Sequence, residues 1–148
     1  MMFNSYMDLA FKEAQSAADR GEVPVGAVLV KDNQIISRAG NRTLEMNDPT
    51  AHAEMLAIRA GGAALGSQRL TGCDLYVTLE PCPMCAAAIS FARIHRLYYG
   101  AVDHKSGGAE SGIRYFSHPT CHHVPEIYGG IGASESADLL KSFFSEKR

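Results

Sequence analysis

Three side chains that can bind a metal, carried by two short motifs, place the strongest constraint on how this chain can fold. His52 precedes Glu54 by two residues in His52-Ala53-Glu54, and Cys82 and Cys85 belong to the run Pro81-Cys82-Pro83-Met84-Cys85. Imidazole and thiolate are ligands of Zn²⁺, and a catalytic zinc keeps three protein ligands with water in the fourth position. The fold must therefore bring two separate segments together at one ion.

The spacing within each motif predicts a division of roles at such a site. Cys82 and Cys85 lie three residues apart, so they share one face if they begin a helix, where the helix dipole favours thiolates. Two thiolates and a neutral imidazole match the charge of Zn²⁺, which lowers the pKa of bound water. Glu54 is not needed as a ligand, so we expect it to move protons between this water and a substrate.

Each motif also has a simpler interpretation. His52 could be a hydrogen-bonded core histidine, and Glu54 could complement the dipole of a helix that begins there. Cys82 and Cys85 could form a redox-active dithiol, as in thioredoxin-like proteins. A structural zinc site would need a fourth ligand. The candidates for that ligand are Cys73, Cys121, His122 and His123.

Composition favours a single domain over residues 1–148. Apolar residues make up 46% of the chain, which is ordinary for a globular protein with a core. Residues 1–8 lack the basic and apolar regions of a signal peptide, and no apolar run is long enough to span a membrane. Four cysteines without an export signal are typical of the reducing cytoplasm, where we expect the protein to act. The net charge of −2 argues against a general nucleic-acid binder but allows a compact site for one RNA hairpin.

Hydrophobic periodicity predicts helices that alternate with strands. We expect helices that begin at Ser5, at Asp48-Pro49 or Thr50, at Pro83 and at Ser134. The second helix should end at Gly61-Gly62, and the last should carry Ala137, Leu140 and Phe144 on its inner face. Strands are expected over residues 25–30, 34–39, 74–79, 96–101 and 126–131, with a tight turn at Asp32-Asn33 and mostly loop over 103–120. This order predicts an α/β fold, a three-layer α/β/α sandwich.

Longer runs around the two motifs resemble the bacterial tRNA-specific adenosine deaminases, within the cytidine deaminase-like superfamily. His-x-Glu followed by Pro-Cys-x-x-Cys is the signature of zinc-dependent nucleobase deaminases. The runs that carry the resemblance are residues 22–30, 40–42, 47–54 and 75–85, followed by Arg93-Ile94, residues 99–101, His118-Pro119 and Phe143-Phe144. The resemblance therefore covers nearly the whole chain.

The resemblance implies a five-stranded mixed sheet between helices, one Zn²⁺ per chain, and a homodimer whose two subunits both contact RNA. It implies that His52, Cys82 and Cys85 bind the zinc and that Glu54 is the catalytic proton shuttle. The residues that it implies for substrate binding are Asn41, Asp103, Lys105 and Phe144. For Phe144, core packing explains the apolar helical position equally well.

Three functions remain as hypotheses. The first is hydrolytic deamination of adenosine to inosine at the wobble (first anticodon) position of a tRNA anticodon stem-loop, where a single-stranded target reduces the cost of extruding the base. The second is the same chemistry on a free base or nucleoside, such as guanine or cytosine, which the negative net charge slightly favours and the resemblance disfavours more strongly. The third is a non-catalytic, zinc-stabilised binding module, which would leave Glu54 without a role.

Overall fold

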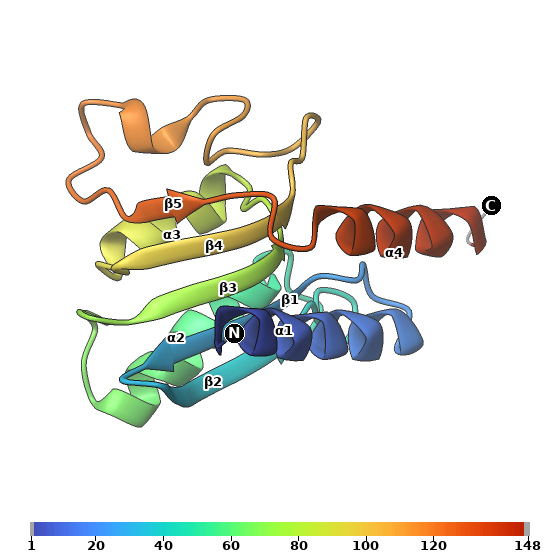
Figure 1. Cartoon of the computed structure of the whole chain (residues 1–148), viewed down its shortest axis with the longest axis horizontal. Coiled ribbons are helices and arrows are strands. Elements are labelled where there is room, and N and C mark those ends of the chain that lie inside the picture. The colour runs from blue at the N-terminus through green and yellow to red at the C-terminus, as the bar shows by residue number, and fades with distance from the viewer. Residues whose placement is uncertain (1, 147–148) are drawn as a thin grey trace.

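A five-stranded mixed sheet forms the centre of the fold (Figure 1). The computed structural model describes residues 2–146. The strands are β1 (Gly26–Lys31), β2 (Gln34–Gly40), β3 (Asp74–Leu79), β4 (Arg96–Ala101) and β5 (Glu126–Tyr128), in the order β2-β1-β3-β4-β5. β1 pairs antiparallel with β2 and β3, whereas β4 runs parallel to β3 and β5.

Helices cover both faces of this sheet, which confirms the three-layer α/β/α sandwich. The helices are α1 (Met2–Asp19), α2 (Ala53–Leu65), α3 (Pro83–Phe91) and α4 (Ala133–Glu146), and η1 (Tyr115–Ser117) is a short 3₁₀ turn. Figure 1 shows α1 and α4 on one face and α2 and α3 on the other. No helix within residues 2–146 combines the length and the apolar character needed to cross a membrane.

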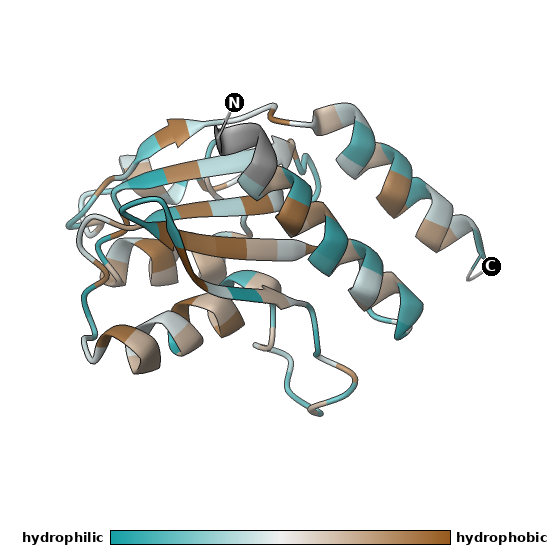
Figure 2. Ribbon diagram, turned by 60° about the horizontal axis from the view of Figure 1, so that its bottom comes forward, coloured by the Kyte–Doolittle hydropathy of each residue, from teal (hydrophilic) through white to brown (hydrophobic). Residues whose placement is uncertain are grey.

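The two faces of the sheet carry separate apolar clusters. On β1, Ala27 and Leu29 pack toward α2 and α3, whereas Val28 and Val30 pack with Met7 of α1. A strand that is buried on both faces appears in the sequence as a continuous apolar run, which is why the sequence predicts it well. Figure 2 shows this hydrophobic character along the central strands.

Backbone geometry explains two local features of the first hairpin and helix. Asp32 and Asn33 have φ angles of 50° and 62°, which suits the tight turn expected between β1 and β2. Gly26 lets α1 approach β1 closely, because a Cβ on Gly26 would collide with the carbonyl oxygen of Ala10. The first α1 turn starts at Met2, so the prediction that Ser5 is the N-cap is wrong.

The expected bounds of α2 are also wrong at both ends. The helix begins after His52 rather than near Asp48-Pro49, because the Asp48 carboxylate accepts the Thr50 amide at 2.8 Å and closes a separate turn. It continues past Gly61 and ends at Gly66, whose φ of 66° is the left-handed conformation typical of a helix end. Gly61 is a packing position instead, where a Cβ would collide with Leu29.

The last two elements differ from expectation in a similar way. β5 ends at Tyr128, three residues early, and Gly130 follows with a φ of 83°. α4 begins at Ala133, so Ser134 lies inside it. Ser136 and Phe143 are the buried residues of α4. Ser136 packs against Gly100, since a Cβ added to Gly100 would lie 3.2 Å from the Cβ of Ser136. Phe144 is 48% exposed, so the expectation that it packs on the inner face is wrong.

Candidate active site

The starts of two helices meet at the candidate site. His52 immediately precedes α2 and Cys82 immediately precedes α3, and both have extended backbones with ψ angles of 153° and 172°. Neither side chain forms a capping hydrogen bond with its own helix, so both remain available as ligands. Pro83 occupies the start of α3, where a missing amide hydrogen costs nothing, and Cys85 lies in its first turn.

The donor atoms of these residues fit one zinc ion. The Nδ1 atom of His52 lies 3.6 Å from the Sγ atoms of both Cys82 and Cys85. All three donor atoms lie within 4.8 Å of one another. Zn–S and Zn–N distances of about 2.3 and 2.0 Å in a tetrahedron place nitrogen and sulfur roughly 3.5 Å apart. The spacing is therefore that of a tetrahedral site with three protein ligands.

The other candidate ligands lie elsewhere among the described residues. Within residues 2–146, the one group of three or more His, Cys, Asp or Glu side chains that could hold a metal ion consists of His52, Cys82 and Cys85. Cys121 contacts Ser90 at 3.5 Å instead, and the ring of His123 lies 2.6 Å from the carbonyl oxygen of Ile94. The geometry therefore does not support a structural zinc site that is closed by a fourth ligand from these residues.

The two thiols differ in acidity. A hydrogen bond from Cys85, with further help from His52, lowers the pKa of Cys82 to about 4. The same thiol pairing, together with burial, raises the pKa of Cys85. The hydrogen bond with Cys82 and the charge of Glu54 outweigh burial and raise the pKa of His52. A negative charge on this thiol pair lies beside the start of α3, where the helix dipole favours it.

Glu54 is a buried carboxyl group beside these ligands. It is the second residue of α2 and is 3% exposed. Burial raises its pKa to about 7, against the smaller opposing effects of a backbone hydrogen bond and of the nearby His52. Glu54 also lines the same cavity as His52 and Cys82. A carboxyl group that exchanges its proton near neutral pH is suited to general acid and base catalysis.

Asn41 joins the site from the end of β2. Its Oδ1 accepts a hydrogen bond from the Ala53 amide at 2.7 Å, so Asn41 supplies the cap that His52 does not give to α2. Its carbonyl oxygen accepts a hydrogen bond from Arg20 at 3.1 Å. The side chain is 8% exposed and lines the cavity. Since its oxygen is engaged, the amide nitrogen is the group that Asn41 can offer to a ligand.

A small cavity of about 220 Å³ is lined by His52 and Cys82, two of the three clustered donor residues. Its walls are Val23, Val25, Asn41, Thr43, His52, Glu54, Leu79, Glu80, Cys82, Asp103 and Ser106. Ligand pockets for drug-sized molecules usually occupy about 300–1,000 Å³, so this cavity suits a single planar ring system. The walls combine apolar side chains with polar groups, which matches such a ligand.

A larger groove of about 910 Å³ adjoins this cavity. The two share Val23, Leu79, Asp103 and Ser106 as walls. The groove also collects Lys105 and Phe144, two residues that the sequence resemblance implied, from the 102–106 loop and from α4. The groove is wide enough for chemical groups that extend beyond the ring in the small cavity.

Asp103 has a structural task in this loop. Its Oδ1 accepts hydrogen bonds from the amides of Lys105 at 3.2 Å and Ser106 at 2.9 Å. The carboxylate thus folds the loop around itself, while the residue lines both the cavity and the groove. We therefore expect Asp103 to shape the wall as much as to contact a ligand.

Sequence reasoning missed several wall residues. Val23, Thr43 and Glu80 line the cavity but belong to no recognised ligand pattern. The one available signal was for Glu80, a carboxylate placed between a buried strand and the Cys82 motif, where an apolar residue would be expected. Nothing in the sequence indicated that the loop at Thr43 folds toward the start of α2.

Comparisons with known proteins agree with this geometry. Residues 3–101 match the model of the cytidine and deoxycytidylate deaminase zinc-binding region. The tRNA-specific adenosine deaminase of Agrobacterium fabrum is 64% identical over 143 residues, which cover 97% of this chain and 94% of that protein.

Two solved structures are similar in fold and sequence. One comes from studies of A-to-I editing by tRNA:A34 deaminases at the wobble position; its TM-score is 0.91 at 64% identity, and the match covers 92% of this chain and 99% of that one. The other is a guanine deaminase from Bacillus subtilis, with a TM-score of 0.66 at 37% identity over 84% of this chain and 82% of that one.

Proposed function

The chain belongs to the zinc-dependent cytidine and deoxycytidylate deaminase family, and on this basis we propose that it deaminates adenosine to inosine at the wobble position of tRNA. The observation that carries the chemistry is the buried Glu54 in one cavity with His52 and Cys82, whose donor atoms cluster with that of Cys85. The substrate follows from the relative that is 64% identical over nearly the whole chain and acts on tRNA.

The reaction consumes one water and releases one ammonia. The oxygen of water bonds to the amine-bearing carbon of the purine, the bond from that carbon to the amine breaks, and a carbonyl remains. When bound by His52, Cys82 and Cys85, zinc would make this water acidic enough to react near neutral pH. Glu54 accepts the proton of the water, passes it to the adjacent ring nitrogen, and carries a second proton to the departing amine.

The cavity walls orient the base for this transfer. Asn41 directs its amide nitrogen to an acceptor atom of the purine, because its oxygen is held by the Ala53 amide. Val25 and Leu79 offer apolar surface to the ring. The groove beside the cavity accepts the neighbouring nucleotides, with Lys105 near a phosphate and Phe144 beside a base. Asp103 fixes the loop that carries Lys105.

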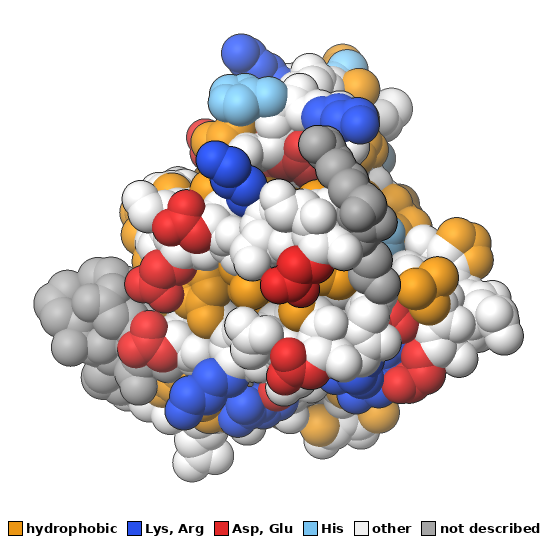
Figure 3. Space-filling model, turned by 90° about the vertical axis from the view of Figure 1, so that its right-hand side faces the viewer, with side chains coloured by type: hydrophobic (Ala, Val, Ile, Leu, Met, Phe, Trp, Pro, Cys, Tyr) orange, Lys and Arg blue, Asp and Glu red, His pale blue; other side chains and the backbone are white. Residues whose placement is uncertain are grey.

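An anticodon stem-loop suits the charge of this surface. Figure 3 shows acidic, basic and hydrophobic side chains interspersed at the end toward which α1 and α4 point. With a net charge of −2, the protein is better suited to a local contact with one loop than to a long contact with phosphates. A single-stranded loop also lets the target base enter without breaking a base pair.

We further infer a cytoplasmic homodimer. tRNA and reduced cysteines are both typical of that compartment. Two large apolar side chains, Leu44 and Phe91, are 69% and 70% exposed and supply surface for a second copy. Light scattering at micromolar concentration measures the assembly, and a species of 16.0 kDa alone would contradict the dimer.

A second candidate is deamination of free guanine, which the 37% identical guanine deaminase favours. The test follows ammonia release from an anticodon stem-loop with adenosine at the wobble position, the same hairpin with guanosine there, free adenosine and free guanine. We expect turnover of the first substrate alone. Efficient release from guanine with an untouched hairpin would replace the tRNA assignment. No release from any substrate by zinc-loaded protein would support a non-catalytic zinc module.

A further inference from the structure

Two glutamates that have no part in the proton transfer lie buried beside the cavity. Glu22 and Glu80 are each 2% exposed, which is as buried as the apolar core. Among residues 2–146, neither carboxylate lies within 4.0 Å of a basic side chain. A buried carboxylate is unfavourable unless hydrogen bonds replace the lost water. Both side chains find those bonds in loops that line the active site.

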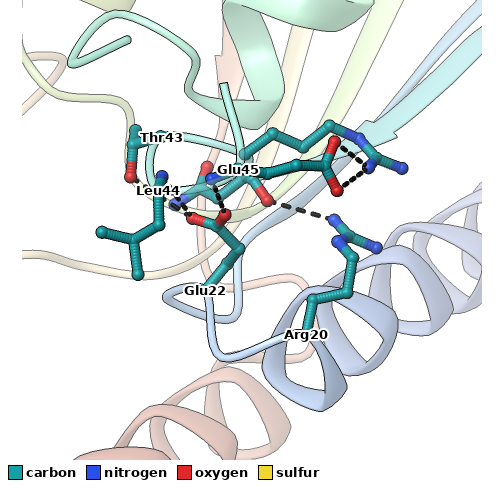
Figure 4. A network of polar contacts seen from close by, with 7 residues as sticks. Arg20, Glu22, Thr43, Leu44 and Glu45 are labelled. Carbon is teal, nitrogen blue, oxygen red and sulfur yellow. Dashed lines mark hydrogen bonds and ion pairs between the residues drawn. The ribbon is translucent and has the colours of Figure 1, made fainter. Parts of the chain in front are cut away.

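Glu22 binds the loop that follows β2 (Figure 4). Its Oε1 accepts hydrogen bonds from the Leu44 amide at 3.1 Å and the Thr43 hydroxyl at 3.3 Å, and its Oε2 accepts the Glu45 amide at 2.9 Å. Thr43 and Asn41 of this loop are walls of the cavity. The turn after α1 therefore fixes one side of the active site through a single carboxylate.

Glu80 binds the loop that follows β4. Its Oε1 accepts the Asp103 amide at 3.0 Å, and its Oε2 accepts the amides of Glu110 at 2.9 Å and Ser111 at 2.8 Å. Gly107 passes directly over the carboxylate, since a Cβ there would lie 2.7 Å from it. The loop from 103 to 111 is thus wrapped around a side chain two positions before Cys82.

These contacts require an acid at both positions. Each carboxylate receives three hydrogen bonds, and five of the six donors are backbone amides that cannot accept a bond in return. A glutamine of the same shape would turn its own NH₂ group toward backbone N–H groups. One donor would then face another in a buried site, and neither would form a hydrogen bond.

We propose that Glu22 and Glu80 are positioning residues that set two loop walls of the cavity and thereby fix the base relative to Glu54. This inference rests on the proposed deaminase function. Glu22 sets the loop with Asn41 and Thr43, and Glu80 sets the loop with Asp103 and Ser106. Glu80 also lines the cavity, but both carboxylates act through the loops that they hold, to which each commits three hydrogen bonds.

The test uses zinc-loaded Glu22→Gln and Glu80→Gln proteins, with Glu13→Gln as the matched control. Glu13 pairs with Arg38 at 2.8 Å and lines neither cavity nor groove. Residue-resolved hydrogen exchange should be at least about tenfold faster at Leu44 and Glu45 in the first variant, and at the amides bound by Glu80 in the second. Zinc content should stay equal to wild type.

Kinetics on the hairpin then separate positioning from general stability. We expect kcat/KM to fall roughly 10- to 100-fold in both variants, the size of effect that a small misplacement of a bound substrate produces. The control should stay within about twofold of wild type in both readouts. If either glutamine variant does not fold, the aspartate variant keeps the charge one methylene short of the amides and is measured in the same way.

Two outcomes would overturn the inference: faster exchange of the loop amides with kcat/KM within twofold of wild type, or unchanged exchange of those amides. A failure of the proposed function is distinguishable, because it appears in the wild-type protein. If wild type acts on guanine and not on the hairpin, the same kcat/KM comparison is made with guanine.

Discussion

Asn41 offers a substrate one kind of group, because its Oδ1 is already engaged by the Ala53 amide. Asn41→Asp keeps this acceptor and replaces the amide nitrogen with a second acceptor. We expect kcat/KM for the hairpin to fall about tenfold or more, the size of one lost hydrogen bond, and Tm to fall as well, because the new buried carboxylate keeps one protein hydrogen bond. Steady-state kinetics and thermal unfolding measure the two effects. Unchanged kinetics would show that Asn41 donates nothing to the base.

Glu54→Gln preserves the shape of the proton carrier and removes its chemistry. Glu54 is 3% exposed, and glutamine has nearly the same size, so the variant should fold. Glu54 is not among the three clustered metal donors, so the variant should also keep its zinc. We expect kcat to fall at least about 10²-fold. Single-turnover inosine formation with parallel metal analysis checks this. Near wild-type turnover in zinc-loaded protein would contradict the assigned role.

Glu22 links stability to pH. Burial alone raises its pKa, but hydrogen bonds from Glu45, Leu44 and Thr43 and the charge of Arg20 outweigh burial, so the pKa lies below the usual value. The folded state therefore binds this proton less readily than the unfolded state. The contribution to stability is complete above the unfolded pKa of about 4.3 and disappears as pH falls through the folded pKa.

The comparison of wild type with Glu22→Gln makes this effect measurable. We expect the difference in free energy of unfolding between them to be largest above about pH 5 and to shrink as the pH is lowered below the usual glutamate pKa. Urea unfolding at a series of pH values provides the data. A difference that grows on acidification would mean that the folded pKa is raised.

At the scale of elements, Gly26 tests how closely α1 packs on β1. A Cβ at this position would collide with the Ala10 carbonyl oxygen and lie 2.6 Å from the Ala14 nitrogen. Gly26→Ala should destabilise the protein by about 3 kcal/mol, the upper part of the usual range for overpacking. The atoms that the new Cβ would meet belong to the backbone of α1, which cannot rotate out of the way as a side chain can. Denaturant unfolding measures this.

The control for this prediction is Gly62→Ala in α2. There an added Cβ comes no closer than 3.2 Å to the Ser67 carbonyl oxygen. Alanine also favours a helix over glycine by about 1 kcal/mol, so the net change should stay within about that amount. If both variants lose equal stability, close packing at Gly26 is not the cause.

The ends of α2 show what the sequence could and could not predict about an element. The existence of the helix and the place of His52 at its start follow from local pattern. Its true start depends on Asn41, whose side chain accepts the Ala53 amide. Asn41 lies before the intervening loop, so no sequence pattern near Ala53 indicates this cap. The true end of the helix is at Gly66, which adopts the left-handed conformation, while Gly61 stays inside the helix and packs against Leu29 of β1. A contact with a distant segment therefore caps the start of the helix, whereas a local glycine closes its end.

At the scale of the whole molecule, the sheet was predictable because its strands are short, apolar runs between turn residues. The metal-binding residues were predictable because their chemistry and spacing are distinctive. The cavity was not, since Val23, Thr43 and Ser106 meet there only after three loops have folded. Nor could the sequence separate a core role for Phe144 from a place in the groove, which its 48% exposure now favours.

The groove predicts a salt effect that distinguishes RNA from a free base. Lys105 is exposed on its wall, so Lys105→Ala should raise KM for the hairpin and reduce the slope of log(kcat/KM) against log salt by about one. Lys31 lies at the end of β1 and lines neither the cavity nor the groove, so Lys31→Ala should change neither KM nor the slope. Kinetics at several salt concentrations measure the slope. An equal slope in wild type and Lys105→Ala would exclude a phosphate contact at Lys105.

The loop wrapped around Glu80 divides into parts that differ in their freedom to diverge. Gly107 and Gly108 have no room for a side chain, because a Cβ would meet the Glu80 carboxylate at 2.7 Å or the Pro83 nitrogen at 2.5 Å. Residues 104–106 lie between these glycines and the anchored Asp103, with side chains toward the groove. New substrate preferences can therefore evolve within those three positions while the turn that carries Cys82 is inherited unchanged.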